Sequence, residues 1–145
     1  MRKALVTSAL LLLGAAYLAG YWPQREQVRA AQQSAAQAQQ QLAGLQAVAR
    51  LCRLENDLLV LIAQTENQNY GNARGLSQAF FDNLRREADR DPRAPYKPDL
   101  ENILGQRDAI TAALARNDTA SATPLRQVLA QMQQVMEKAA AQAGV

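Results

Sequence analysis

Few residues of this chain could carry out chemistry. The sequence has no His and a single Cys, Cys52, so the commonest catalytic base and the commonest metal ligand are both missing. Glu55 and Asp57 lie two residues apart, and side chains at that spacing do not face each other on a helix, which argues against a carboxylate pair. No Gly-rich phosphate loop, metal-ligand spacing or nucleophile elbow occurs. We therefore expect a protein that is not an enzyme and that has no metal site and no cofactor.

One polar cluster could still gather around a ligand. Glu66, Asn67, Asn69 and Tyr70 supply a carboxylate, two amides and a phenol within five residues. The same residues are typical of a solvated helix end and turn, where Asn side chains bond to nearby backbone groups. We interpret the cluster as a cap and turn.

Residues 92–98 contain three of the five prolines, with Arg93 and Tyr96 between them. This spacing, with its flanking cations, is that of a proline-rich segment that docks onto another protein. Such loops more often only set the turn between two helices. Both interpretations stay open, and Arg93 and Tyr96 are kept as candidate interaction residues.

The elements that would position these side chains are predicted to be helices. Ala and Gln supply 29 and 18 of the 145 residues, while the aromatic residues amount to only 5%. Ala and Gln lose little on entering a helix, whereas β-branched and aromatic residues favour strands. The composition therefore predicts an all-α protein.

The first segment, residues 1–23, has the pattern of a membrane anchor. Nineteen residues without a charge, 4–22, follow Arg2 and Lys3. At about 1.5 Å per residue they span roughly 28 Å, close to the thickness of a hydrocarbon core. Tyr17, Tyr21 and Trp22 resemble the aromatic belt of a membrane interface.

The charges that flank this segment predict its orientation. Arg2 and Lys3 place the N-terminus in the cytoplasm and the rest of the chain outside it, in the periplasm or its equivalent, which makes the inner (cytoplasmic) membrane the expected location. The competing interpretation is a secretory signal that is cleaved, with Gly14-Ala15-Ala16 as the cleavage site. Cleavage there would leave an apolar N-terminus, so we favour the anchor.

The second segment, residues 24–47, is predicted to be a helical stalk rich in Gln and Ala. Apolar residues recur at alternating steps of three and four, as in a coiled coil. Most of them are Ala, which buries little area, so a solvated stalk, a disordered Gln-rich tract and a helix that pairs with a partner remain alternatives. Cys52 falls on the same seam, either as a small apolar residue or as a cysteine that pairs with its twin in a dimer. The candidate contact residues of this seam are Val28, Ala31, Ala35, Ala38, Leu42, Leu45 and Cys52.

The third segment, residues 48–142, is predicted to form an antiparallel bundle of two helical hairpins. The chain is expected to fray from Ala140, and residues 143–145 are expected to form a tail outside the bundle. The first helix ends at 69–72, where Gly and Asn tolerate left-handed geometry, and Leu59 and Val60 widen its apolar stripe. The second helix ends before residues 91–98, in a solvated stretch of mixed charge from Arg85 to Arg90. The third runs from an N-cap at Asp99 to residues 117–119, and the fourth begins with Thr123 as N-cap and Pro124 at the first helical position.

These features together predict a single-pass envelope protein that acts as a scaffold or assembly subunit through helix–helix contacts. Its expected partners are the membrane and a protein, either a second copy or a subunit of a membrane complex. Residues 23–145 carry fourteen basic and thirteen acidic side chains, so no basic excess points to a nucleic acid. The alternative function is a secreted helical chaperone or ligand-binding bundle released by signal cleavage.

Overall fold

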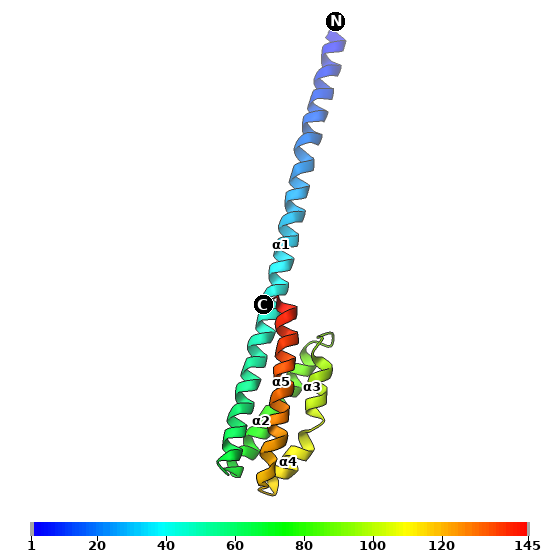
Figure 1. Cartoon of the computed structure of the whole chain (residues 1–145). Helices are drawn as coiled ribbons and strands as arrows, with labels where there is room; N and C mark the ends of the chain where they lie inside the picture. Colours follow the sequence, from blue (N-terminus) through cyan, green and yellow to red (C-terminus); the bar gives the residue numbers. More distant parts are fainter. Residues whose placement is uncertain (1, 145) are drawn as a thin grey trace. The chain divides into compact units, whose positions relative to one another are not determined.

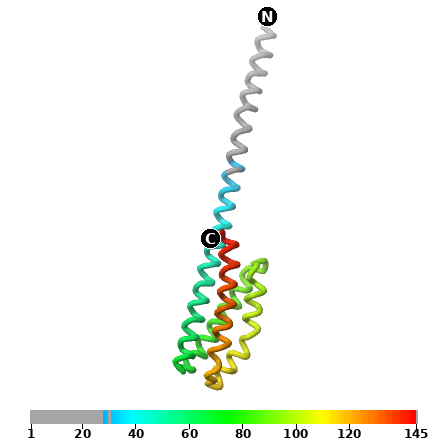
Figure 2. The backbone as a smooth tube through the Cα atoms, viewed as in Figure 1, coloured from blue at the N-terminus to red at the C-terminus, as the bar shows by residue number. Residues whose placement is uncertain are grey.

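The computed structural model describes the backbone of residues 2–144 and the side chains of residues 28, 29 and 31–144 (Figure 2). Every regular element in this range is a helix, which confirms the predicted all-α class. The elements are α1 (Arg2–Glu66), α2 (Tyr70–Arg90), α3 (Lys97–Leu104), α4 (Arg107–Ala115), a short 3₁₀ helix η1 (Thr119–Ser121) and α5 (Ala122–Ala143) (Figure 1).

The chain divides into two units, residues 1–40 and residues 41–145, and α1 contributes to both. In the first unit, the described side chains are all exposed. The predicted membrane segment, 4–22, with Tyr17, Tyr21 and Trp22, lies outside the residues whose side chains are described. Within the described part of the chain, no helix combines the length and hydropathy that crossing a membrane requires.

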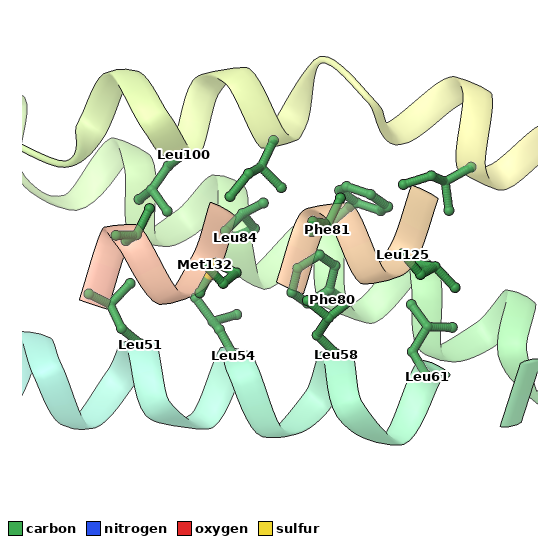
Figure 3. Close-up of a cluster of buried hydrophobic side chains, with 14 of the residues drawn as sticks. Leu51, Leu54, Leu58, Leu61, Phe80, Phe81, Leu84, Leu100, Leu125 and Met132 are labelled. Atoms are coloured by element: carbon green, nitrogen blue, oxygen red, sulfur yellow. The ribbon is translucent and has the colours of Figure 1, made fainter. Parts of the chain in front are cut away.

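The second unit is a helical bundle. Its successive helices run in alternating directions, with α3 and α4 following each other along one side (Figure 1). α2 packs against α3 and α4, while α3 also packs against α5. The last part of α1 completes the bundle, and its leucines point toward side chains of α2 and α5 (Figure 3).

The core of this bundle follows the apolar stripe that the sequence predicts. On α1, residues at steps of three and four are buried, because these steps keep side chains on one helix face. Phe80 and Phe81 of α2 are both fully buried and meet edge to face, with ring centroids 5.1 Å apart. The labelled core residues in Figure 3 are Leu51, Leu54, Leu58, Leu61, Phe80, Phe81, Leu84, Leu100, Leu125 and Met132.

The turn between α1 and α2 occupies residues 67–69, earlier than the predicted 69–72, and it is built differently. The left-handed residue is Gln68, with φ of 58°, whereas Gly71 belongs to the first turn of α2. Asn69 is the N-cap residue of α2, and its backbone carbonyl accepts a hydrogen bond from the Ala73 N–H at 2.9 Å. The freedom of Gly71 is therefore not used at this turn.

The predicted third helix is wrong in two respects. It begins at Lys97, so that Asp99 lies in the first turn and Tyr96 occupies the N-cap position. It also breaks after Leu104, and α4 begins at Arg107. Ile110 follows Ile103 by a step of seven residues, which equals about two helical turns, so the apolar pattern keeps its phase across the break and does not reveal it.

Both ends of α5 also differ from the prediction. The N-cap residue is Ser121 rather than Thr123, and Pro124 is the third helical residue, where its missing N–H still costs nothing. The helix does not fray at Ala140. It continues to Ala143 and ends at Gly144, whose φ of 76° gives the left-handed cap that Gly adopts without strain.

The predicted widening of the α1 stripe is a further error. Leu59 and Val60 do not face the core, since both side chains are exposed. Leu59 follows the buried Leu58 by one residue, which is about 100° of rotation on a helix, and Val60 follows it by about 200°. These two residues belong to a second apolar face of α1.

Candidate functional site

The second apolar face of α1 in the bundle is an exposed strip, which we call the outer face. All its residues are exposed, and neighbouring members are one, three or four residues apart. Asn56 and Leu54 are two residues apart, as are Leu59 and Leu61, and that offset is about 200° on a helix. The outer face therefore lies opposite the core. It consists of Leu42, Leu45, Ala49, Cys52, Asn56, Leu59, Val60 and Ala63.

Exposed large apolar side chains are confined to α1 among the described residues. They are exposed to between 42% and 57% of their surface. The helices α2 to α5 bury their large apolar residues completely or in part. The five residues are Val28, Leu42, Leu45, Leu59 and Val60.

The seam predicted in residues 28–52 corresponds to exposed residues throughout. Leu42, Leu45 and Cys52 are part of the outer face, and the remaining members belong to the first unit. The sequence spacing of the seam continues through Asn56 and Leu59, beyond the predicted end at Cys52. The seam residues of the first unit are Val28, Ala31, Ala35 and Ala38.

Cys52 is a free, exposed thiol in the middle of the outer face. It is therefore not the small buried residue that one of the two interpretations expected. Pairing with the same cysteine of a second copy stays a prediction. Non-reducing electrophoresis of the oxidised protein tests it, since a band that remains monomeric contradicts the disulfide.

The proline-rich segment separates its two candidate residues. Arg93 is exposed, and its backbone N–H donates to Asp91 Oδ1 at 2.9 Å. Tyr96 is only 4% exposed and belongs to the core. Burial raises the pKa of Tyr96, the negative charge of Glu87 adds to this effect, and Arg50 opposes it. A partner docked on this segment would reach Arg93 but not the Tyr96 ring.

The polar cluster at 66–70 does not converge on one point. Glu66 forms an ion pair with Arg126 of α5. The Asn69 amide donates to Gln64 Oε1 at 2.8 Å, and Asn67 is exposed. The Tyr70 hydroxyl is buried and has no hydrogen-bond partner among the residues that the structure describes. These residues act as a turn and an inter-helix contact.

A charged groove between α1 and α2 was not predicted, and we call it the arginine groove. It measures about 270 Å³. Its α1 wall has polar residues at 50, 53 and 57, and its α2 wall has them at 83, 86, 87 and 90. Both spacings are those of one helix face. The lining residues are Arg50, Arg53, Leu54, Asp57, Asn83, Arg86, Glu87 and Arg90.

Glu87 is the buried centre of this groove, with only 6% of its side chain exposed. The Arg50 Nε donates to both carboxylate oxygens, at 3.0 and 2.9 Å, and the Arg90 Nε donates to Oε2 at 3.2 Å. A buried carboxylate needs such partners because losing water without them is costly. The predicted solvated end at 85–90 is thus wrong for Glu87.

The sequence contained a signal for this groove that the prediction overlooked. Polar residues repeat at steps of three and four on both α1 and α2, as apolar stripes do. However, Arg50 and Glu87 are 37 residues apart, and only the packing of α1 against α2 brings them together. Periodicity identifies each wall, but it does not identify the pair.

Comparisons with protein-family models, curated proteins and solved structures found no match for this chain.

Proposed function

We propose that this protein is a non-enzymatic scaffold or assembly subunit that binds partner helices through the outer face of α1. The observation that carries this proposal is that all exposed large apolar side chains among the described residues belong to α1. Exposed apolar surface is unfavourable in water. A continuous strip of it on one helix is therefore typical of a surface that docks another helix.

The composition of the outer face supports a helix as its partner. None of the outer-face residues is charged, and the small residues Ala49, Cys52 and Ala63 among them let a second backbone approach closely. Burying a fully exposed Leu side chain contributes about 1.5–3 kcal/mol, so each half-exposed leucine offers roughly 1 kcal/mol on contact. The spacing of three and four residues matches the register of a coiled coil.

The proposal includes an anchor in the inner (cytoplasmic) membrane, with the N-terminus in the cytoplasm and the bundle outside. Its support is the uncharged sequence 4–22, the basic residues before it and the aromatic residues at its end. Such an anchor restricts the protein to a surface, where weak helix contacts gain effective concentration. The partner is then another membrane-bound or periplasmic protein, or a second copy.

Site-specific photo-crosslinking in living cells tests the docking surface. A photoreactive amino acid replaces Leu45, Ala49 or Leu59 of the full chain, one at a time. Matched control positions are the exposed residues Gln78 on α2 and Gln134 on α5. We expect adducts of a defined mass at the outer-face positions and none at the controls. Equal adducts at all positions, or adducts only at the controls, would contradict the proposal.

The alternative, a secreted bundle released by signal cleavage, predicts a shorter mature chain. The arginine groove gives such a bundle a place to hold a ligand. Intact-mass measurement of the protein isolated from its native envelope separates the two functions. A mass that includes residues 1–22 supports the anchor, and a mass that lacks them supports the secreted bundle.

A further inference from the structure

The arginine groove has more positive charge than its own carboxylates neutralise. Four guanidinium groups face two carboxylates, those of Asp57 and Glu87, so the lining carries a net charge of +2. The groove shares no residue with the outer face. The arginine groove and the outer face can therefore be altered by separate substitutions.

The guanidinium groups keep most of their donors unused. Arg50 and Arg90 contact Glu87 through Nε, and their terminal Nη groups form no hydrogen bond with any described residue. Arg53 and Arg86 form neither an ion pair nor a side-chain hydrogen bond within the described part of the chain. Glu87 thus holds two arginines in place while their outer ends stay available.

From this geometry we infer that the arginine groove binds a phosphate monoester. A phosphate monoester carries a charge close to −2 at neutral pH, which matches the net charge of the lining. Guanidinium groups bind phosphate oxygens through paired, charge-assisted hydrogen bonds, and several arginines can share the three terminal oxygens. A single carboxylate would leave half of the excess charge unmatched, and a metal cation would be repelled.

The groove also suits the rest of such a ligand. Leu54 and the aliphatic parts of the arginine side chains provide apolar surface beside the charged groups. A volume of about 270 Å³ exceeds that of a bare phosphate ion, so a small organic group can enter with it. The ligand can therefore be a soluble phosphate monoester or the head group of a lipid that carries one.

Calorimetric titration of the full chain in uncharged detergent micelles tests this inference, with phenyl phosphate as the probe at low ionic strength. Arg53→Gln and Arg86→Gln each remove unpaired donors without breaking an ion pair. We expect each substitution to weaken binding at least about tenfold, because a hydrogen bond to a charged group is worth more than 1.4 kcal/mol in many proteins. The matched control is Arg85→Gln, which changes an exposed neighbour outside the groove and should leave affinity within about twofold.

Phenyl sulfate provides a second probe of the same shape with one negative charge. It should bind distinctly more weakly than phenyl phosphate, because only the dianion matches the lining. Circular dichroism of each variant confirms that the fold is retained. The inference is overturned if the wild-type protein shows no saturable binding of phenyl phosphate, if the double variant R53Q/R86Q binds as tightly as the wild type, or if phenyl sulfate binds equally well.

A short-chain phosphatidic acid, added to the same micelles, distinguishes the two sources of the phosphate. Tighter binding than phenyl phosphate indicates a lipid head group, and weaker binding indicates a soluble ligand. In both cases the R53Q/R86Q variant must lose the interaction for the inference to stand.

Discussion

The two faces of α1 within the bundle differ in what they contact. Leu58 is fully buried and Leu59, the next residue, is 46% exposed, although both have the same side chain. The inner face packs against side chains of α2 and α5 (Figure 3), while the side chains of the outer face are exposed. One face of this helix stabilises the fold, and the other is available for a partner.

Among the substitutions considered, alanine at Leu58 and alanine at Leu59 should differ most in their effect on the free energy of unfolding. Leu58→Ala leaves a cavity in a packed core and is expected to lower the free energy of unfolding by about 2–5 kcal/mol. Leu59→Ala removes a half-exposed side chain and should change it by less than about 1 kcal/mol. Urea unfolding followed by circular dichroism measures both values. Similar losses for the two variants would contradict the assignment of the faces.

The arginine groove offers a second comparison, between a paired and an unpaired arginine on α1. Arg50→Gln leaves the buried Glu87 carboxylate with Arg90 as its remaining partner. This substitution is expected to lower the free energy of unfolding by about 1–3 kcal/mol. Arg53→Gln breaks no ion pair among the described residues, so its free energy of unfolding should lie within about 0.5 kcal/mol of the wild-type value. The same unfolding experiment compares them, and equal costs would show that the Arg50–Glu87 pair does not support the fold.

Two glycines within helices differ in how closely another helix approaches them. A Cβ at Gly44 would lie 2.9 Å from the Cβ of Ala143 on α5, whereas no described atom other than those of its chain neighbours and its own helix backbone lies within 4 Å of a Cβ at Gly75. Gly75→Ala should therefore stabilise the protein by about 0.5–1 kcal/mol through its helix propensity. Gly44→Ala should stabilise the protein less, because Ala143 must shift to make room for the added Cβ. Thermal unfolding ranks the two variants, and a larger gain at Gly44 would argue against close packing of α1 on α5.

The smallest expected effect is the alkaline pH dependence that Tyr96 contributes. Burial raises the pKa of this phenol above its usual value of 10.0, so the folded state holds the proton more tightly than the unfolded chain. The stability that this tighter proton binding contributes is fully present below about pH 10 and is lost as the pH rises through the pKa of the folded state. Relative to Tyr96→Phe, the wild type should lose stability above about pH 10. Parallel curves for the two proteins would contradict this burial.

The sequence predicts the helical class and the inner face of α1 because apolar residues at steps of three and four have a direct physical meaning. It does not show the break at Gly105, since Ile103 and Ile110 remain in phase across it. Leu59 and Val60 are misassigned because apolar character alone does not say which side of a helix the bundle will cover. The Arg50–Glu87 pair is missed because its partners meet only after two helices have packed.

The one cysteine of the chain provides a direct test of whether a partner covers the outer face of α1. Cys52 lies within the outer face and is exposed in the isolated protein. Its rate of modification by a membrane-permeant maleimide can be compared in native membranes and after detergent extraction. A matched control carries Cys52→Ser and Gln134→Cys, which places the thiol at an exposed position on α5. If a partner covers the outer face, modification of Cys52 is slow in native membranes and fast after extraction, while the control thiol reacts fast in both. Equally fast modification of Cys52 in native membranes would contradict such coverage.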